Sequence, residues 1–229
     1  MNVIVFGASG MVGAGVLAEC LDDPRVESVL VVGRTPCGVV HPGVRELLRT
    51  DFFSYGDIMA ELKGHDACFF CLGVSSAGMK EAEYHRVTYD LTIAAAEALA
   101  ALNPGMTFCY VSGEGTDSTE RGRSMWARVK GKAENRLLQM PFKAYMFRPG
   151  FIQPLKGVRS KTKLYQAFYD IVGPLFPLLK RLAPDHLTTS ENLGRAMIQV
   201  AARGYTKRIL ENPDINEAGG YDHDEAAGR

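Results

Sequence analysis

The sequence has no excess of charge of either sign. It contains 26 basic and 26 acidic side chains, which gives a formal net charge of zero at pH 7. Proteins that bind nucleic acid or strongly anionic surfaces usually carry a basic balance or a basic patch. The composition therefore argues against nucleic acid, an anionic membrane surface or an acidic protein as the partner.

Cysteine is also scarce, and its pattern excludes a disulfide framework. The five cysteines are odd in number and spread along the chain, which indicates a reduced, cytoplasmic protein. Cys68 and Cys71 have the spacing of a redox pair, but residues three apart on a strand point to opposite faces. We therefore expect two buried, unpaired thiols there. Cysteine and histidine never cluster at zinc-ligand spacing, so no metal site is predicted.

No hydrophobic run reaches the length of a membrane span. The uncharged centre of the most apolar region runs only from Ile171 to Leu179, far short of the roughly 20 residues needed. The chain also opens directly into a strand pattern, without a basic and apolar leader. We expect residues 164–182 to pack on the main domain or to form a surface for a second copy or a protein partner. Membrane-surface attachment is the minor alternative.

What the sequence does contain is a regular alternation of apolar strands and helices. Strands are predicted at residues 3–6, 28–34, 66–73, 106–113, 143–150 and 208–212, and helices at 11–21, 53–63, 81–101, 124–138 and 190–202. Continuous apolar strands that alternate with helices are typical of a parallel sheet covered on both faces. The prediction is an α/β fold with a doubly wound parallel sheet, a Rossmann fold.

Three glycines follow the first predicted strand at three-residue intervals, in the segment Gly7-Ala-Ser-Gly-Met-Val-Gly. Gly7 permits a tight exit from the strand, Gly10 lets backbone approach a pyrophosphate, and Gly13 permits close packing of helix and strand. The helix start offers free N–H groups and a positive dipole end to phosphates. Between a strand and an apolar helix, this pattern predicts a dinucleotide site. Its expected residues are Gly7, Ser9, Gly10, Met11, Val12 and Gly13.

The end of the second predicted strand bears on the choice of dinucleotide. Sites for NAD usually place a carboxylate there, against the ribose hydroxyls, whereas this strand ends in Gly33 and Arg34. A guanidinium suits a 2′-phosphate, so the sequence favours NADP, with NAD as the alternative. If Arg34 is only a solvated residue, this preference falls.

Further segments carry a resemblance to a known superfamily. Besides GASGMVG they are Thr50-Asp51-Phe52 after a third strand segment, CLGVSSAG (71–78), HRVTYD (85–90), YVSGEGTD (110–117), VKGKAE (129–134) and FRPG (147–150). From Met1 to about Asn212 the chain resembles the short-chain dehydrogenase/reductase superfamily. It is most similar to the atypical branch of small NAD(P)H-binding, epimerase-like proteins, near the TIP30-like (HTATIP2-like) and NmrA-like groups.

The resemblance implies a set of cofactor contacts. In order from adenine to nicotinamide they come from Asp51, Phe52, Leu72, Gly73, Lys130, Pro149 and Phe151. The first two would border the adenine, the next two would lie along the nicotinamide ribose, and the last two would flank the nicotinamide amide. Lys130 would hold hydroxyl groups of the nicotinamide ribose.

The catalytic signature of the family is incomplete in this chain. The family uses a tyrosine four residues before the lysine as the proton donor or acceptor, and here Trp126 takes that place. An indole N–H does not act as an acid or base near neutral pH. The partner serine also falls on Gly113, with Ser112 one residue away. Ser112 and Lys130 are the remaining candidates for catalysis.

Other side chains are weaker candidates to replace the tyrosine, since a packed aromatic or a solvated charge explains each of them better. They are Tyr84, His85, Tyr89, Tyr110, Glu114 and Asp117.

Three functions follow, each with an unknown small-molecule substrate or ligand. The first is an NADP-dependent oxidoreductase with non-standard proton handling. The second is a catalytically silent NADP(H)-sensing regulator or scaffold. The third is an epimerase or isomerase that retains its dinucleotide. We expect residues 1–150 to form the dinucleotide-binding domain, 151–216 a small helical substrate or partner lobe integrated with it, and 217–229 a disordered tail.

Overall fold

The computed structural model describes residues 1–154 and 184–221 of the chain. The predicted oligomer or partner surface at 164–182 lies outside the described residues, as does the end of the chain from residue 222. Within the described ranges, no helix combines the length and the apolarity needed to cross a bilayer.

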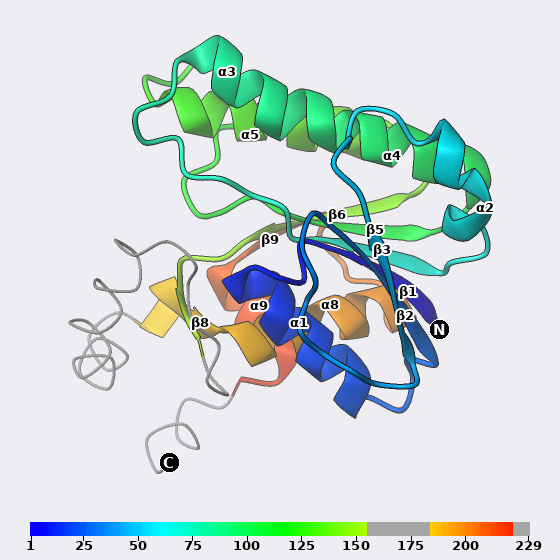
Figure 1. The fold of residues 1–229 in the computed structure, drawn as a ribbon. Coiled ribbons are helices and arrows are strands. Elements are labelled where there is room, and N and C mark those ends of the chain that lie inside the picture. The colour runs from blue at the N-terminus through cyan, green and yellow to red at the C-terminus, as the bar shows by residue number, and fades with distance from the viewer. Residues whose placement is uncertain (155–183, 222–229) are drawn as a thin grey trace.

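A seven-stranded parallel sheet forms the centre of the molecule, with the strand order β3-β2-β1-β4-β5-β6-β9 (Figure 1). The strands are β1 (Asn2–Phe6), β2 (Ser28–Gly33), β3 (Val44–Leu48), β4 (Ala67–Phe70), β5 (Thr107–Val111), β6 (Lys143–Arg148) and β9 (Ile209–Glu211). Each adjacent pair is parallel. This order confirms the predicted doubly wound sheet, and it reverses direction between β1 and β4.

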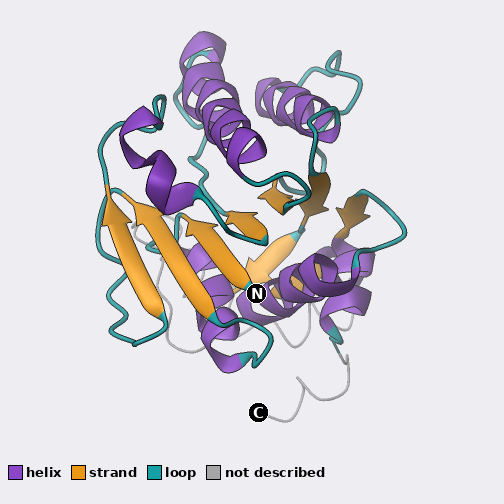
Figure 2. Ribbon diagram, turned by 90° about the vertical axis from the view of Figure 1, so that its right-hand side faces the viewer, coloured by secondary structure: helices purple, strands orange, loops and turns teal. Residues whose placement is uncertain are grey.

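Helices cover both faces of the sheet (Figures 1 and 2). One face carries α1 (Met11–Asp22), α8 (Ser190–Arg203) and α9 (Asn212–Gly219), and the other carries α2 (Met59–Leu62), α3 (Glu81–His85), α4 (Leu91–Leu102) and α5 (Met125–Leu138). A π-helical turn, Arg86–Asp90, joins α3 to α4. Two short strands, β7 (Phe151–Gln153) and β8 (Leu187–Thr189), pair beside the main sheet.

The strand residues alternate between two hydrophobic cores. Val3 and Val5 of β1 face the α1 and α8 layer, whereas Ile4 and Phe6 face the opposite layer, and all four are fully buried. Such strands read as continuous apolar runs because both faces are covered. Cys68 is buried in one core, whereas Cys71 is half-buried and packs against the other. Both thiols are free, which confirms that they are unpaired, but Cys71 is less buried than expected.

Three segments differ from the sequence-based expectations. β3 is an edge strand with half-exposed side chains, and its charged sequence VRELL lacks the apolar run of the inner strands. The helix expected over 53–63 is reduced to a 3₁₀ turn (Gly56–Ile58) and α2. Residues 217–219, expected to belong to a disordered tail, instead end the helix α9, which begins behind a capping box formed by Glu211 and Asp214.

The residues after 184 do not form a separate core. β9 pairs with β6 as the seventh strand of the sheet, and α8 packs on α1 beneath the first strand. The side chain of Ser190 lies against Gly15, only 2.4 Å from the position that a Cβ on that glycine would take. The described residues 184–221 therefore pack as part of the main domain.

Candidate functional site

The carboxyl ends of β1 and β4 meet at the point where the strand order reverses, which is where doubly wound sheets bind ligands. Gly7 leaves β1 with a φ of +81°, a conformation that favours glycine. A Cβ at this position would lie 3.0 Å from the carbonyl carbon of Cys71, so the turn after β1 contacts the segment after β4. The first glycine is therefore required both by the turn and by this contact.

The other two glycines shape the start of α1. A Cβ on Gly13 would lie 2.3 Å from the carbonyl oxygen of Gly7, so no side chain fits between the helix and the turn. Gly10 precedes α1 and is exposed, and no side chain within the described residues caps the helix there. The first N–H groups of α1 therefore face the outer side of the turn with their positive dipole end. This donor set, with a bare backbone above it, fits a diphosphate.

Side chains from the end of β2 lie beside this turn. The hydroxyl of Thr35 donates a hydrogen bond to Oγ of Ser9 at 3.2 Å, which ties the glycine turn to the residue after Arg34. Arg34 itself is exposed. Arg34 is thus an exposed residue whose neighbour in the sequence contacts the glycine turn.

The segment after β3 is organised by Arg49, a residue that the sequence analysis missed. Its buried guanidinium donates to the carbonyl oxygens of Asp51 and Ser54, and it lies 4.8 Å over the ring of Tyr55. Asp51 is exposed, and its carboxylate accepts a hydrogen bond from the N–H of Phe53 at 2.8 Å. Arg49 therefore fixes the shape of the segment that presents Asp51.

The remaining predicted cofactor residues also follow strands and so reach the same edge of the sheet. Phe52 is only 4% exposed and packs in the core, so its side chain supports the segment from below. Leu72 is half-buried and Gly73 is exposed after β4. Pro149 is buried after β6, and its carbonyl oxygen accepts a hydrogen bond from the N–H of Glu114 at 2.9 Å. Phe151 begins β7.

Ser112 and Lys130 meet at the end of β5. The ammonium of Lys130 donates a hydrogen bond to the carbonyl oxygen of Ser112. Burial lowers the pKa of Lys130 to about 8, and the negative charge of Glu134 opposes this shift. The hydroxyl of Ser112 is buried and donates to Glu134 at 2.5 Å, with a second contact to the carbonyl oxygen of Phe147 at 3.1 Å. The two predicted catalytic residues are thus in contact, but the serine hydroxyl is engaged inside the protein.

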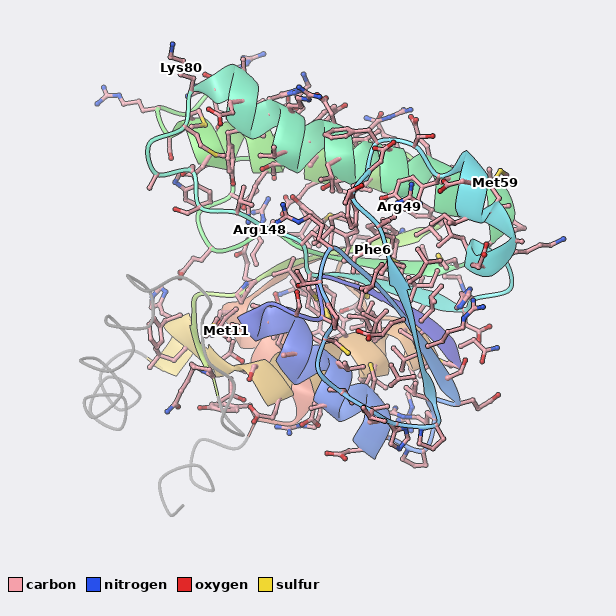
Figure 3. All side chains as sticks on the ribbon, viewed as in Figure 1. Phe6, Met11, Arg49, Met59, Lys80 and Arg148 are labelled. Carbon is pink, nitrogen blue, oxygen red and sulfur yellow. The ribbon has the colours of Figure 1, made fainter. Side chains whose placement is uncertain are left out.

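A buried ion pair lies directly behind these two residues. Glu134 on α5 is fully buried and accepts hydrogen bonds from Nε and Nη2 of Arg148 at 3.1 and 2.5 Å. Arg148, at the end of β6, also donates to Glu211 at 3.0 Å and to the hydroxyl of Ser118 at 2.5 Å. Figure 3 shows Arg148 between the sheet and the α5 layer. Removing one partner of such a pair costs about 3–5 kcal/mol because a charge is left buried.

Trp126 takes the place of the family tyrosine one turn before Lys130. Its side chain is half-buried, and its six-membered ring lies 3.7 Å from where a Cβ on Gly115 would stand. The indole therefore covers the loop after β5. This position confirms that no phenol stands next to Lys130 at the expected step of α5.

The four other aromatic candidates for proton handling fall into two groups. Tyr84 and Tyr110 are core side chains, and burial raises the pKa of Tyr110. His85 and Tyr89 stack on each other with ring centres 4.6 Å apart, outside the sheet edge on α3 and the π turn. Each of these four has a structural explanation.

The two carboxylates of the loop after β5 differ from each other. Asp117 accepts hydrogen bonds from the hydroxyl of Thr119 and the N–H of Gly122, both at 2.6 Å, and these bonds lower its pKa. Glu114 is hydrogen-bonded to Nδ1 of His186, just before β8, above Gly150. Asp117 therefore shapes the loop, whereas Glu114 joins it to the segment before β8.

The sequence analysis missed Arg49, Glu134, Arg148 and His186. A signal for Glu134 existed, because it follows Lys130 by four residues on one helix and such residues share a face. Arg148 stands in the FRPG segment, at the end of a strand whose buried residues are otherwise uncharged. A buried arginine on a strand requires an acidic partner, and that partner was not sought.

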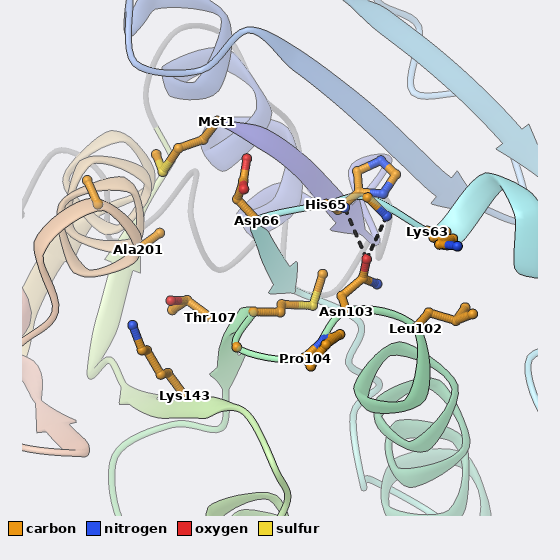
Figure 4. A pocket seen from close by; sticks show the side chains of 14 residues that line it. Met1, Lys63, His65, Asp66, Leu102, Asn103, Pro104, Thr107, Lys143 and Ala201 are labelled. Carbon is orange, nitrogen blue, oxygen red and sulfur yellow. Dashed lines mark hydrogen bonds between the residues drawn. The ribbon is translucent and has the colours of Figure 1, made fainter.

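A hollow of about 660 Å³ lies at the amino-terminal edge of the sheet, opposite the candidate site (Figure 4). Its central side chain, Asn103, accepts hydrogen bonds from the N–H groups of Gly64 and His65 and donates to the carbonyl oxygen of Leu62. These bonds join the end of α2 to the end of α4, so Asn103 has a structural role there.

Several known proteins are similar to this chain in sequence. No family model matches the chain. It is 31% identical to Leucinostatins biosynthesis cluster protein T of Purpureocillium lilacinum over 71% of this chain and 57% of that protein. It is 27% identical to Protein HTATIP2 of Rattus norvegicus over 66% of this chain and 62% of that protein. The chain therefore spans less than two thirds of both relatives. A third, Protein FMP52, mitochondrial, of Debaryomyces hansenii, is 28% identical over 71% and 70% of the two chains.

Solved structures share the fold. The Bordetella bronchiseptica enzyme WbmF in complex with NAD+ has a TM-score of 0.66 and 18% identity, covering 96% of this chain and 79% of WbmF. A short-chain dehydrogenase/reductase family oxidoreductase from Burkholderia thailandensis has a TM-score of 0.65 and 15% identity, covering 93% and 92%. The chain is thus a homologue of the HTATIP2 and FMP52 proteins, and it shares the fold of solved short-chain dehydrogenase/reductases. The resemblance drawn from the sequence segments is thereby confirmed, and this chain keeps the lysine of the signature without its tyrosine.

Proposed function

We propose that this chain binds NADP(H) at the carboxyl edge of the sheet and transfers hydride to a small carbonyl or quinone compound. The observation that carries the proposal is the uncapped start of α1, where Gly7, Gly10 and Gly13 leave a bare backbone at the switch point. When bound, the reduced dinucleotide supplies the hydride.

The residues that would hold the dinucleotide fall along one edge of the sheet. The N–H groups of the first turn of α1 would bind the diphosphate, and Arg34, next to the Thr35 that contacts Ser9, would serve the 2′-phosphate. Asp51 serves the adenine, and Lys130 serves the nicotinamide ribose. WbmF has been solved in complex with NAD+, NADH and UDP, so we keep NAD as the alternative to NADP.

Proton handling then rests on Lys130. The hydroxyl of Ser112 is engaged by Glu134, and the indole of Trp126 does not ionise near neutral pH. Because its pKa is lowered to about 8, Lys130 holds a proton at neutral pH yet releases it more readily than an exposed lysine. We propose that the Lys130 ammonium, directly or through a water molecule that it holds, supplies the proton to the reduced oxygen.

A second function is favoured by the same observations. Trp126 in place of the tyrosine, together with the buried hydroxyl of Ser112, describes a site that binds a dinucleotide without acting on it. A catalytically silent NADP(H) sensor would show saturable binding and no turnover. A cytoplasmic location stays a prediction from the cysteine pattern, and the D. hansenii relative is named mitochondrial.

The test uses Trp126, the single tryptophan of the chain, as a fluorescence reporter. Titration with NADPH and NADH is expected to quench its emission and to raise the melting temperature, with NADPH bound about tenfold more tightly. Arg34→Ala should remove the preference for NADPH and leave NADH binding unchanged. If neither dinucleotide changes the emission or the melting temperature, the proposed function is wrong.

Turnover then separates the two functions. NADPH consumption with a panel of aldehydes, ketones and quinones supports the oxidoreductase. Saturable binding without consumption on that panel supports the sensor.

A further inference from the structure

Glu134 carries a carboxylate beside the candidate site that is both buried and fully engaged. It is fully buried, and its oxygens accept three hydrogen bonds, one from the hydroxyl of Ser112 and two from the guanidinium of Arg148. Buried carboxylates are retained in proteins only when they are paired in this way. The pair has no role in the proposed binding of the dinucleotide, which raises the question of what it holds in place.

The geometry of α5 gives the answer. Trp126, Lys130 and Glu134 are spaced four residues apart on this helix and so share one face. Glu134 holds the side chain of Ser112, and the carbonyl oxygen of the same serine accepts the hydrogen bond of the Lys130 ammonium. One residue at the end of β5 thus connects the carboxylate to the ammonium through its two polar groups.

We propose that Glu134 is a positioning residue for Lys130. Glu134 fixes Ser112, whose carbonyl oxygen accepts the hydrogen bond of the Lys130 ammonium, and its negative charge favours the charged form of that ammonium. Arg148 holds the carboxylate in turn, with Glu211 and Ser118 on its outer side. The inference deepens the proposed function, in which Lys130 holds the ribose and supplies the proton.

The electrostatics agree with this role. Burial alone favours the neutral amine of Lys130, and the charge of Glu134 favours the ammonium, so the pKa of Lys130 settles at about 8. The other groups around Glu134 are the cation of Arg148 on β6, the carboxylate of Glu211 at the end of β9, and the phenol of Tyr110 on β5, which lies beside Tyr84 of α3. Glu134 is the anion that acts on Lys130.

The charge of Lys130 determines how the affinity for the dinucleotide depends on pH. In the wild type, Lys130 is charged below about pH 8, so dinucleotide affinity should fall as the pH rises through this value. Without the negative charge of Glu134, the ammonium loses its proton at lower pH. The midpoint of the affinity profile should therefore move downward by about one pH unit.

The first experiment measures NADP+ affinity by Trp126 fluorescence between pH 6 and pH 10 on the intact chain. Glu134→Gln should show the lowered midpoint. Glu134→Asp keeps the charge but withdraws it from Ser112, so it should retain the wild-type midpoint with about tenfold weaker binding. Glu211→Gln is the matched control, since it removes the other carboxylate partner of Arg148. A midpoint that moves equally in Glu134→Gln and Glu211→Gln overturns the inference.

A second measurement needs no dinucleotide. NMR of lysine labelled with ¹³C at Cε follows the titration of each ammonium in the free protein, and the missing signal in Lys130→Arg assigns the Lys130 resonance. We expect a midpoint near 8 in the wild type, which Glu134→Gln lowers and Glu134→Asp restores. Titration of Lys130 near the usual lysine value in the wild type overturns the inference even if Glu134→Gln does not fold. If NADP+ does not bind but Lys130 titrates as expected, the proposed function fails and the inference about Glu134 holds.

Discussion

The two ends of the candidate site are built by different means. The phosphate end, Gly7 to Gly13, is made of contiguous backbone, and its shape requires glycines because a side chain would collide with neighbouring backbone. The ammonium end consists of the side chains of Lys130, Glu134 and Arg148 around Ser112, which α5, β6 and the end of β5 bring together. A site made of backbone tolerates no added atoms, whereas a site made of buried charges tolerates no lost partner. The two ends should therefore fail in different ways when residues are exchanged.

The largest expected effect tests the phosphate end. Gly13→Ala places a Cβ within 2.3 Å of the carbonyl oxygen of Gly7 and 2.9 Å of the Cα of Ala8, and both are backbone atoms. The helix or the turn must shift, so we expect a loss of about 3 kcal/mol in the free energy of unfolding. Urea unfolding measures the loss, and NADPH titration measures the accompanying loss of binding.

Gly56→Ala is the matched control, because nothing lies within 4 Å of the Cβ that it adds. Its stability should stay within about 0.5 kcal/mol of the wild type. Equal stability of the two variants would show that the close approach of α1 to the turn does not constrain this end of the site.

The next effect tests whether the ammonium end keeps the geometry of its family. Trp126→Tyr introduces a phenol one turn before Lys130, whose ammonium would lower the pKa of that phenol. We expect NADPH-dependent reduction of carbonyl compounds to rise by about 100-fold, the gain typical of one positioned general acid. Steady-state rates on the same substrate panel check the prediction.

Trp126→Phe removes the indole without adding a hydroxyl and should give no such gain. If both variants react at the wild-type rate, the site around Lys130 has lost more than the tyrosine, which would favour the sensor function.

The smallest effect concerns the segment after β3 that presents Asp51. Here a buried side chain, that of Arg49, fixes the shape of a stretch of backbone. Arg49→Lys keeps the charge but loses the planar fork that reaches the carbonyl oxygens of Asp51 and Ser54. We expect a loss of about 1 kcal/mol in stability and a weaker affinity for AMP, with phosphate binding preserved. Thermal unfolding and titration with AMP and with pyrophosphate measure these effects.

Arg45→Lys, on the exposed edge strand β3, is the control and should change neither quantity. An Arg49→Lys variant that binds AMP as tightly as the wild type would show that the segment after β3 holds its shape without the guanidinium.

The contrast between the two ends also explains what could be predicted from the sequence. Each glycine of the phosphate turn acts on neighbours within a few residues, so its role is readable in a short segment. The inner strands are readable because both of their faces are buried. Glu134 and Arg148 depend on a contact between α5 and β6 that exists only once the sheet has formed. The first and last residues of β3 could not be predicted, because the sequence of this edge strand mixes charged and apolar residues.

The contact of Ser190 with Gly15 has a consequence for how the chain is made. The helix α8, which covers the flank of the helix that begins at the phosphate turn, is synthesised about 170 residues after it. Until then the apolar flank of α1 stays exposed to solvent, and the turn has no packed helix behind it. The helix behind the phosphate turn is thus completed by a segment far downstream in the sequence, so the binding edge matures only after α8 has been synthesised.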